Sequence, residues 1–299
     1  MKIVLTGSTG FIGAALREKL VAAGHQVFGL HARPNAKPAI GDPTDHLVDI
    51  SDWASVSRFA AEIGSCDAII HTAASLDMTL TTPDVSAVNC TGTQNMIRLR
   101  QETGATRFLF MSSLPVIGRP LDLPITETHP TNPETAYHAS KLFGEQLVRL
   151  DGEQNAKVAS TSLRLTAPIG PGMPKNRLLT VLIDCALKNE PIELLGKGGR
   201  RQNYIDVRDI VAAAETLLAG RDTGIYNIAA PCTISNVELA QLCIDRCNSN
   251  SSIVFKGEDS QEDMDWNVST QKALRDFGFT ANIGIEASID ALKTEMMAA

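Results

Sequence analysis

The chain has 299 residues, of which 43% are hydrophobic and 20% charged, so it is long enough for one large core or two smaller ones. Its formal net charge of -7, without any run of Lys and Arg, argues against binding to nucleic acid or to an anionic membrane. The first apolar run is too short for a signal peptide or a membrane span. These properties predict a cytoplasmic protein that acts on small molecules.

Short apolar runs alternate with longer amphipathic stretches from residue 2 to about 165. Gly24 and Gly104 follow two of these stretches, where a helix commonly ends in a left-handed residue. Continuous Val, Ile and Leu runs between helices are typical of a parallel sheet that is buried on both faces. We therefore predict an α/β protein with a doubly wound parallel (Rossmann) sheet in a domain over 1–165. The predicted strands are 2–6, 25–30, 45–50, 67–73, 106–113 and 158–165.

The alternation of apolar runs and amphipathic stretches becomes less regular after residue 165, which predicts a smaller substrate-binding lobe over 166–299. Segments within about 203–230 are expected to return to the main sheet. Six cysteines are scattered without a CxxC pair, so they are predicted to be reduced thiols, and no metal site is assigned. The predicted helices of this half are 177–188, 208–219, 235–246, 269–276 and 285–296.

The stretch TGSTGFIG follows the first predicted strand and opens the first predicted helix. Gly7 allows a tight turn, Gly10 lets the backbone approach a pyrophosphate, and Gly13 lets the helix pack against the sheet. The free N–H groups of the helix N-terminus attract the anion. The pattern predicts a dinucleotide site, and a merely tight strand-to-helix turn is the alternative.

In the stretch ETAYHASKLFGEQ, Tyr137 and Lys141 are four residues apart. Residues at this spacing share one helical face, so phenol and ammonium could meet a common ligand. An ordinary amphipathic helix would show the same spacing by chance. Asn132 is predicted as the N-cap of this helix and Pro133 as its first residue.

Together, TGSTGFIG and YHASK resemble the extended short-chain dehydrogenase/reductase superfamily, which contains NAD(P)-dependent epimerases and dehydratases. The stretches LVDI, HTAA, VNCTGTQNM and RQNYIDVRDIVAA are similar to further segments of this superfamily. The resemblance implies a set of residues that contact the cofactor. They are Gly7, Thr9, Gly10, Phe11, Ile12, Gly13, Asp49, Ile50, Ala73, Ala74, Asn89, Tyr137 and Lys141.

The resemblance also implies a catalytic set of Ser113, Tyr137 and Lys141. Tyr137 would pass a proton to or from the substrate oxygen, Ser113 would orient that oxygen, and the cofactor would move hydride. Lys141 would hold the nicotinamide ribose, and its charge, with that of an oxidised nicotinamide, is expected to lower the pKa of Tyr137. For the neighbouring Ser112 we expect local backbone capping.

The cofactor's ribose is normally held by an acidic residue about 20 positions after the glycine loop. Here His31 stands at that position, Arg33 follows two residues later, and the next carboxylate is Asp42. A guanidinium can hold a phosphate through two hydrogen bonds, so NADP is favoured and NAD is the alternative. His31 and Arg33 complete the predicted cofactor contacts, unless Arg33 is simply a solvated loop residue.

Two departures from the superfamily pattern concern residues that bind the substrate. Superfamily members that act on nucleotide sugars usually carry an Asn and a Tyr where this chain has Ala167 and Ile169, although Arg164, Gly170 and Pro171 match. A second phosphate-binding Arg of the superfamily falls on Gln202. The cations that could replace it, or could simply be solvated, are Lys197, Arg200 and Arg201.

The leading hypothesis is an NAD(P)-dependent enzyme that interconverts a secondary alcohol and a ketone in a small-molecule substrate. It could act as a net reductase, expected to be purified free of nicotinamide, or as an epimerase working through a transient ketone. One alternative is a nucleotide-sugar epimerase or dehydratase. Another is a dinucleotide sensor without catalysis, for which a proton-transferring tyrosine would have no use. A homodimer is possible, and substrate identity stays open.

Overall fold

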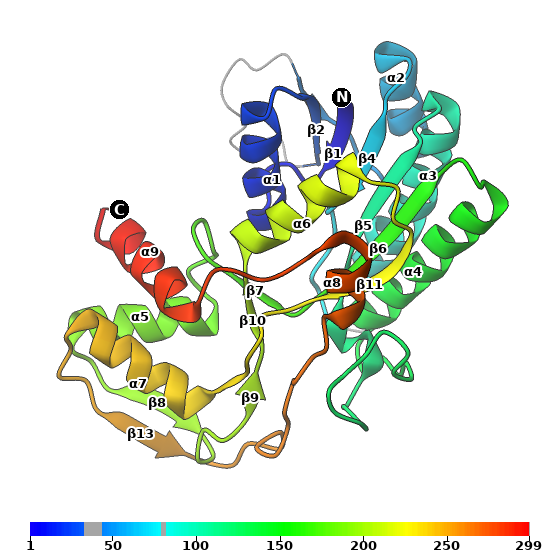
Figure 1. Cartoon of the computed structure of the whole chain (residues 1–299). Coiled ribbons are helices and arrows are strands. Elements are labelled where there is room, and N and C mark those ends of the chain that lie inside the picture. The colour runs from blue at the N-terminus through cyan, green and yellow to red at the C-terminus, as the bar shows by residue number, and fades with distance from the viewer. Residues whose placement is uncertain (33–43, 79–81, 299) are drawn as a thin grey trace.

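The computed structural model describes residues 1–32, 44–78 and 82–298. Its largest element is a seven-stranded sheet with the order β11-β6-β5-β4-β1-β2-β3, in which every neighbouring pair is parallel (Figure 1). The predicted doubly wound Rossmann fold is confirmed. The strands are β1 (Lys2–Thr6), β2 (Gln26–His31), β3 (Asp45–Leu47), β4 (Ala68–His71), β5 (Arg107–Ser113), β6 (Ala159–Leu165) and β11 (Gly224–Ile228).

Helices cover both faces of this sheet. Helices α1 and α6 pack on one face, whereas α2, α3 and α4 pack on the other, which buries the central strands completely (Figure 1). A π-helix, η1 (Val85–Thr91), leads directly into α3, and a short 3-10 helix, η2 (Leu114–Ile117), follows β5. The flanking helices are α1 (Phe11–Ala22), α2 (Trp53–Ile63), α3 (Gly92–Thr103), α4 (Ala136–Gln154) and α6 (Val207–Ala219).

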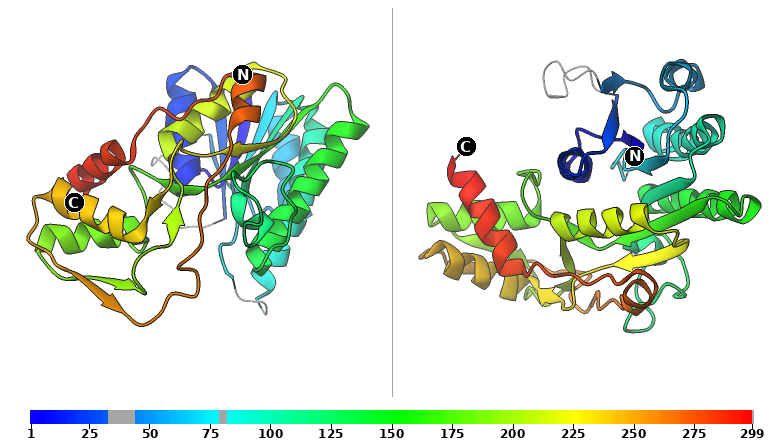
Figure 2. Two further views of the ribbon diagram at one scale, coloured as in Figure 1. Left: turned by 60° about the horizontal axis from the view of Figure 1, so that its bottom comes forward. Right: turned by 45° about the horizontal axis from the view of Figure 1, so that its top comes forward.

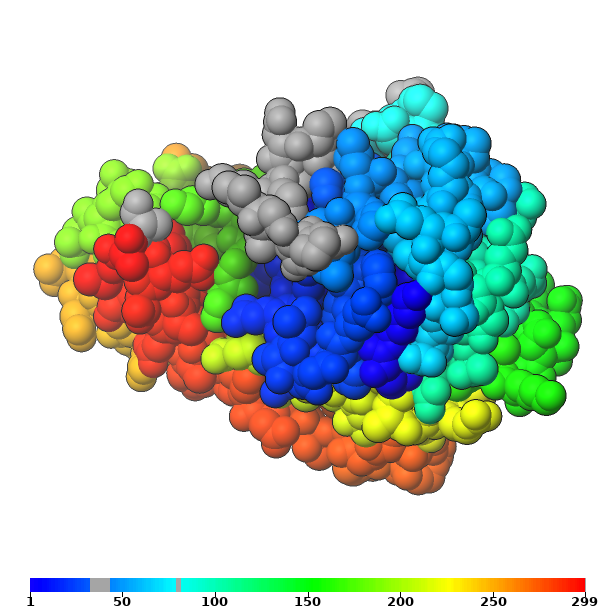
Figure 3. Space-filling model, turned by 90° about the horizontal axis from the view of Figure 1, so that it is seen from above, coloured from blue at the N-terminus to red at the C-terminus, as the bar shows by residue number. Residues whose placement is uncertain are grey.

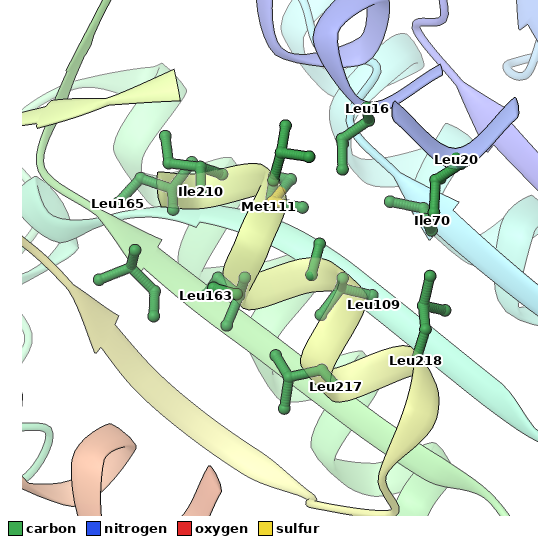
Figure 4. Packing of buried hydrophobic residues seen from close by; sticks show 14 of the residues in the cluster. Leu16, Leu20, Ile70, Leu109, Met111, Leu163, Leu165, Ile210, Leu217 and Leu218 are labelled. Atoms are coloured by element: carbon green, nitrogen blue, oxygen red, sulfur yellow. The ribbon is translucent and has the colours of Figure 1, made fainter. Parts of the chain in front are cut away.

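The core between the sheet and helices α1 and α6 is built from branched aliphatic side chains. Figure 4 shows Leu109 and Leu163 from the sheet near Leu217 of α6, and Leu16 of α1 belongs to the same cluster. Each of these side chains is at most 5% exposed, and burying one leucine contributes roughly 1.5 to 3 kcal/mol. The packed layer holds the strand ends that carry the site in fixed positions.

The order of the strands reverses beside β1, because β4 lies on one side of it and β2 on the other. In such sheets, ligands bind where the strand order reverses, outside the carboxyl ends of the strands. Thr6 and His71, the last residues of β1 and β4, are partners in the parallel register. The glycine turn that begins at Gly7 therefore lies at the switch point.

The second lobe contains α5, α7, α9 and three small sheets, and Figure 2 shows it beside the main sheet; α8 packs instead against β11. Its core joins α5, α7 and α9 to β8. Strand β11 belongs to the main sheet, where it pairs with β6, so the chain crosses between lobes more than once. The remaining elements are β7 (Ala167–Ile169), α5 (Leu178–Lys188), β8 (Ile192–Leu195), β9 (Arg201–Gln202), β10 (Tyr204–Asp206), β12 (Ile234–Ser235), α7 (Asn236–Cys247), β13 (Ile253–Lys256), α8 (Gln271–Phe277) and α9 (Ile285–Ala298).

The start of α4 corrects the predicted cap. The helix begins at Ala136, and Thr135 is its N-cap, with a hydroxyl that accepts a hydrogen bond from His138 N at 3.1 Å. Asn132 instead donates its backbone N–H to Val116 O, and its carbonyl oxygen lies so close to Gly118 that a Cβ there would be 2.1 Å away. That tertiary contact holds Asn132 outside the helix.

The predicted third strand is also shorter than expected, because β3 ends at Leu47. Gly24 and Gly104 follow their helices with φ of 81° and 71°, which confirms the left-handed positions. Within the described ranges, no helix combines the length and apolarity needed to cross a membrane.

Candidate active site

The glycine turn has no room for side chains. Gly7 has φ of 68°, and a Cβ on Gly13 would lie 2.0 Å from the carbonyl oxygen of Gly7. Gly10 is the N-cap of α1 and, having no side chain, leaves the N–H groups of the first turn without a side-chain cap. This cradle fits a dinucleotide pyrophosphate, because an anion can approach backbone donors that a Cβ would cover.

A groove of about 840 Å³ opens beside this turn. Thr9, Gly10 and Phe11 line one side of it, and Pro171 and Gly172 of the second lobe line the other. Figure 3 shows α1 in blue and α9 in red on the two sides of this region. The glycine turn thus lies where the two lobes meet.

A buried histidine connects the two strand ends of the switch point. Nδ1 of His71 lies 2.7 Å from Thr6 Oγ1, and Nε2 lies 3.0 Å from Thr93 Oγ1. Because the Thr93 hydroxyl donates to Asn89 O, it must accept from Nε2–H, which leaves Nδ1 as the acceptor of the neutral imidazole. Burial, with a smaller contribution from Lys141, lowers the pKa of His71 to about 3.

Asn89 joins three segments around the site. Its side chain accepts from Ser75 N at 2.7 Å and donates to Ser140 Oγ at 2.9 Å, and Ser140 donates to the carbonyl of Tyr137. Because Asn89 is only 3% exposed, its side chain is occupied by these hydrogen bonds inside the protein. Asn89 therefore positions the β4 loop against the helix that carries Tyr137.

Tyr137 and Lys141 both lie on the sheet-facing side of α4, and Ser113 ends the adjacent strand β5. The ammonium of Lys141 donates to Met111 O at 2.8 Å and lies 5.8 Å from the centre of the Tyr137 ring. Lys141 is 3% exposed, and burial lowers its pKa to about 8, although Glu145 opposes that change. The structure thus brings the serine-bearing strand end and the Tyr–Lys helix together.

The structure corrects the expectation that the pKa of Tyr137 is lowered. Burial raises the pKa of Tyr137 to about 12, and the positive charge of Arg177 opposes that rise only in part. The ammonium of Lys141 points to the Met111 carbonyl and does not produce the expected lowering. Tyr137 is therefore a neutral phenol here, because desolvation of the phenolate outweighs the charges around it.

Ser112 also differs from its predicted role. Its hydroxyl donates to Glu145 Oε1 at 2.6 Å rather than to the local backbone. Glu145 is fully buried and accepts two hydrogen bonds from Arg164, at 2.9 and 2.8 Å. Arg164, one of the residues that match the superfamily pattern, therefore forms a buried ion pair with Glu145.

The remaining predicted cofactor residues differ in how far they are buried. Ile50 is buried against Gly92, whereas Asp49 is exposed and its carboxylate accepts from Ser51. Ala73 follows β4 and donates its N–H to Thr6 Oγ1. The half-buried residues Thr9, Phe11, Ile12, His31 and Ala74 complete this group. Arg33 and Asp42 lie outside the described residues.

The cations of the second lobe differ in how they are paired. Arg201 is held by Glu238 at 3.0 Å and by Thr233. Arg200, by contrast, has an Nε atom that is buried without a hydrogen-bond partner among the described residues, and its charge acts on Tyr204. Lys197 is exposed.

Sequence reasoning missed His71, Glu145 and Arg177 as parts of the site. Glu145 stands four residues after Lys141, which was a usable signal, but a glutamate on an amphipathic helix is usually solvated. His71 lies at the end of a buried strand, and the sequence around it gave no sign of its partners. Arg177 approaches Tyr137 only through the fold of the second lobe.

The parallel sheet, the glycine turn at the switch point and the Tyr–Lys helix define a Rossmann protein of the short-chain dehydrogenase/reductase type. The model of the NAD dependent epimerase/dehydratase family matches residues 3–229, and the chain belongs to this family.

Several curated and solved proteins resemble the chain. UDP-glucuronic acid decarboxylase 4 of Arabidopsis thaliana is 26% identical over 270 residues, which are 86% of this chain and 59% of that relative, so the chain spans about three fifths of its length. A glycan biosynthesis protein of Haloferax volcanii, Agl12, is 27% identical over 97% of this chain and 98% of its own.

Among solved structures, a UDP-glucose 4-epimerase of Thermotoga maritima with UDP-glucose has a TM-score of 0.91 at 19% identity, covering 100% of this chain and 99% of that one. The dTDP-glucose 4,6-dehydratase DesIV of Streptomyces venezuelae, with NAD bound, has a TM-score of 0.86 at 22% identity, covering 100% and 97%. At these identities the likeness shows the fold.

Proposed function

We propose that the protein is an NAD(P)-dependent enzyme that interconverts a hydroxyl group and a ketone on the sugar of a nucleotide sugar. The observation that supports this proposal is the contact between the helix of Tyr137 and Lys141 and the strand that ends at Ser113. Lys141 donates to the carbonyl of Met111, two residues before Ser113, and its ammonium lies 5.8 Å from the centre of the Tyr137 ring. A dinucleotide sensor would have no use for this arrangement.

Each residue has a defined task. A nicotinamide, when bound, supplies and accepts hydride. Tyr137, a phenol in its present surroundings, donates its proton to a substrate oxygen, and it accepts one only where added positive charge lowers its pKa from about 12. Ser113 orients that oxygen, and Lys141 holds the ribose and stabilises the phenolate.

The choice of a nucleotide sugar over a simple carbonyl compound rests on the relatives and on one cation. Relatives and structural neighbours act on UDP- and dTDP-linked sugars by their names. In place of the usual Asn and Arg, which are Ala167 and Gln202 here, we propose Arg200 as the phosphate-binding cation, because its Nε has no hydrogen-bond partner among the described residues. A net reductase is the competing function.

The bound cofactor of the purified protein tests this choice. An epimerase or dehydratase keeps its dinucleotide through two hydride transfers, whereas a net reductase exchanges it in every cycle. We expect denatured protein to release dinucleotide in near-stoichiometric amount, measured by chromatography. Protein that is free of nicotinamide, and that consumes added NADPH only with a simple carbonyl substrate, would establish the reductase instead.

For the cofactor itself we propose NADP, with Arg33 as the partner of its 2′-phosphate. The support is His31 at the end of β2, where an acidic residue would favour NAD. Several solved neighbours contain NAD, which is the alternative. In calorimetric titrations, Arg33→Ala should weaken NADP binding by about 1 to 3 kcal/mol and leave NAD unchanged. Equal losses would remove Arg33 from this role.

We further propose a homodimer in the cytoplasm. Phe143 and Leu150 are 38% and 40% exposed on α4, and their spacing of seven residues places them on one face of the helix. All six cysteines are unpaired, which suits a reducing compartment. Sedimentation should show a dimer for the wild type and a monomer for Phe143→Glu; a monomeric wild type would refute the assembly.

A further inference from the structure

Lys141 is a buried cation whose environment is largely apolar. Its ammonium lies 4.8 Å from the centre of the Phe110 ring and has one described hydrogen bond, to Met111 O. Removing an ammonium from water favours its neutral form, which could neither hold a ribose hydroxyl as a cation nor stabilise a phenolate. The proposed function therefore needs a group that keeps Lys141 charged.

The charged and titratable groups around Lys141 come from four elements, one of which is β6, whose Arg164 is bound to Glu145. On its own helix, Tyr137 is a neutral phenol and Glu145 a carboxylate. From β4, His71 is neutral and its charged form is disfavoured by Lys141. From β5, Met111 contributes a carbonyl dipole. Glu145 is thus the one carboxylate in the described chain that acts on Lys141.

Glu145 is held rigidly one helical turn from Lys141. Arg164 binds both of its oxygens, and Ser112 donates a further hydrogen bond at 2.6 Å. Arg164 also donates to Glu127 O, and the Glu127 carboxylate accepts from Asn227 N on β11. The carboxylate is therefore fixed to three strands of the main sheet, and Ser112 directly precedes Ser113.

We propose that Glu145 is a positioning residue of the active site: its fixed carboxylate is the buried counter-charge that keeps the Lys141 ammonium charged. This inference rests on the proposed function for its consequence, but the charge state of Lys141 can be measured without substrate or turnover. Failure of this inference is therefore distinguishable from failure of the proposed function.

A purely structural ion pair is the competing explanation, and α4 offers a matched control. Asp151 lies on the same helix and forms a buried pair with Arg100 of α3 at 2.7 Å, with both side chains at most 6% exposed. Six residues separate it from Glu145, or about 9 Å along the helix axis. Asp151→Asn thus removes an equivalent pair farther from Lys141.

The experiment follows the side-chain carbon of Lys141 by NMR in protein labelled with ¹³C-lysine, with its signal assigned by Lys141→Arg. In Glu145→Gln, Lys141 should lose its proton at least about one pH unit lower than in the wild type, a tenfold weaker proton affinity. Asp151→Asn should leave the titration unchanged while lowering the melting temperature comparably. Glu145→Asp, which keeps the charge, should restore most of the wild-type titration.

Equal shifts in Glu145→Gln and Asp151→Asn, or no shift in Glu145→Gln, would overturn the proposal. If Glu145→Gln fails to fold because Arg164 is left buried and unpaired, the double variant Glu145→Gln/Arg164→Met replaces it. The double variant removes both charges of the pair, and a lower titration of Lys141 is again expected, because Glu145 is the charged partner that raises its pKa. An unchanged titration there would also reject the proposal.

Discussion

The switch point of the first lobe and the cations of the second lobe satisfy their polar groups in different ways. Around the switch point of the first lobe, the buried groups pair within the chain, as His71 does with Thr6 and Thr93. In the second lobe, the Nε of Arg200 is buried and has no hydrogen-bond partner among the described residues, whereas the guanidinium of Arg201 is paired with Glu238 and Thr233. The difference indicates that the switch point is organised by contacts within the protein, whereas one cation of the second lobe keeps an unused hydrogen-bond donor.

The largest effect is expected where the proton moves. Tyr137→Phe removes only the phenolic oxygen, so turnover should fall by roughly 10² to 10⁴-fold while cofactor affinity stays nearly unchanged. Reduction of the dinucleotide by substrate, followed by absorbance, gives the rate, and calorimetry gives the affinity. Near-normal turnover in this variant would remove Tyr137 from the chemistry and weaken the contrast between the lobes.

Acid should destabilise the first lobe through His71. The unfolded chain binds a proton at this residue below about pH 6.5, whereas the folded chain binds it only near pH 3. The free energy of unfolding should therefore fall as the pH falls from about 6.5 to 3, by up to about 1.4 kcal/mol per pH unit.

His71→Gln provides the comparison for that measurement, because it keeps polar atoms between the two threonines without a group that titrates. Urea unfolding at several pH values should give the variant a shallower pH dependence than the wild type. Identical slopes would show that His71 is not a source of the acid sensitivity.

The second lobe should respond at Arg200 more than at Arg201. Arg200→Gln is expected to weaken the binding of UDP by about 1 to 3 kcal/mol, because a charge-assisted phosphate contact is lost. Arg201→Gln is the matched control, since Glu238 and Thr233 already hold that guanidinium. If calorimetry finds the larger loss at Arg201, the paired and unpaired cations have been assigned the wrong way round.

The smallest expected effect is on the free energy of unfolding, through the cost of burying the Lys141 ammonium. Burial lowers the pKa of Lys141 to about 8, so the charged form is destabilised in the folded protein. Lys141→Met should abolish function yet increase the free energy of unfolding at pH 7 by about 1 to 2 kcal/mol. Urea unfolding measures this, and a clear loss of stability would mean that the ammonium's contact with Met111 outweighs its desolvation.

Much of the first lobe could be predicted because its signals are local. The glycine turn depends on contacts within a few residues, and the strands and helices follow from apolar periodicity. The left-handed Gly24 and Gly104 belong to the same class of signal. The spacing of Tyr137 and Lys141 placed both on one helical face before their partners were known.

The tertiary structure alone decided how these groups are paired. Thr135 rather than Asn132 caps α4, because the turn at Gly118 holds Asn132 elsewhere. Tyr137 is a weaker acid than expected, because burial is a property of the whole fold. Glu145 and Arg164 are 19 residues apart in sequence, and only the packing of α4 on β6 makes them a buried pair beside Lys141. Periodicity determines which face a residue occupies, but not which charge it meets there.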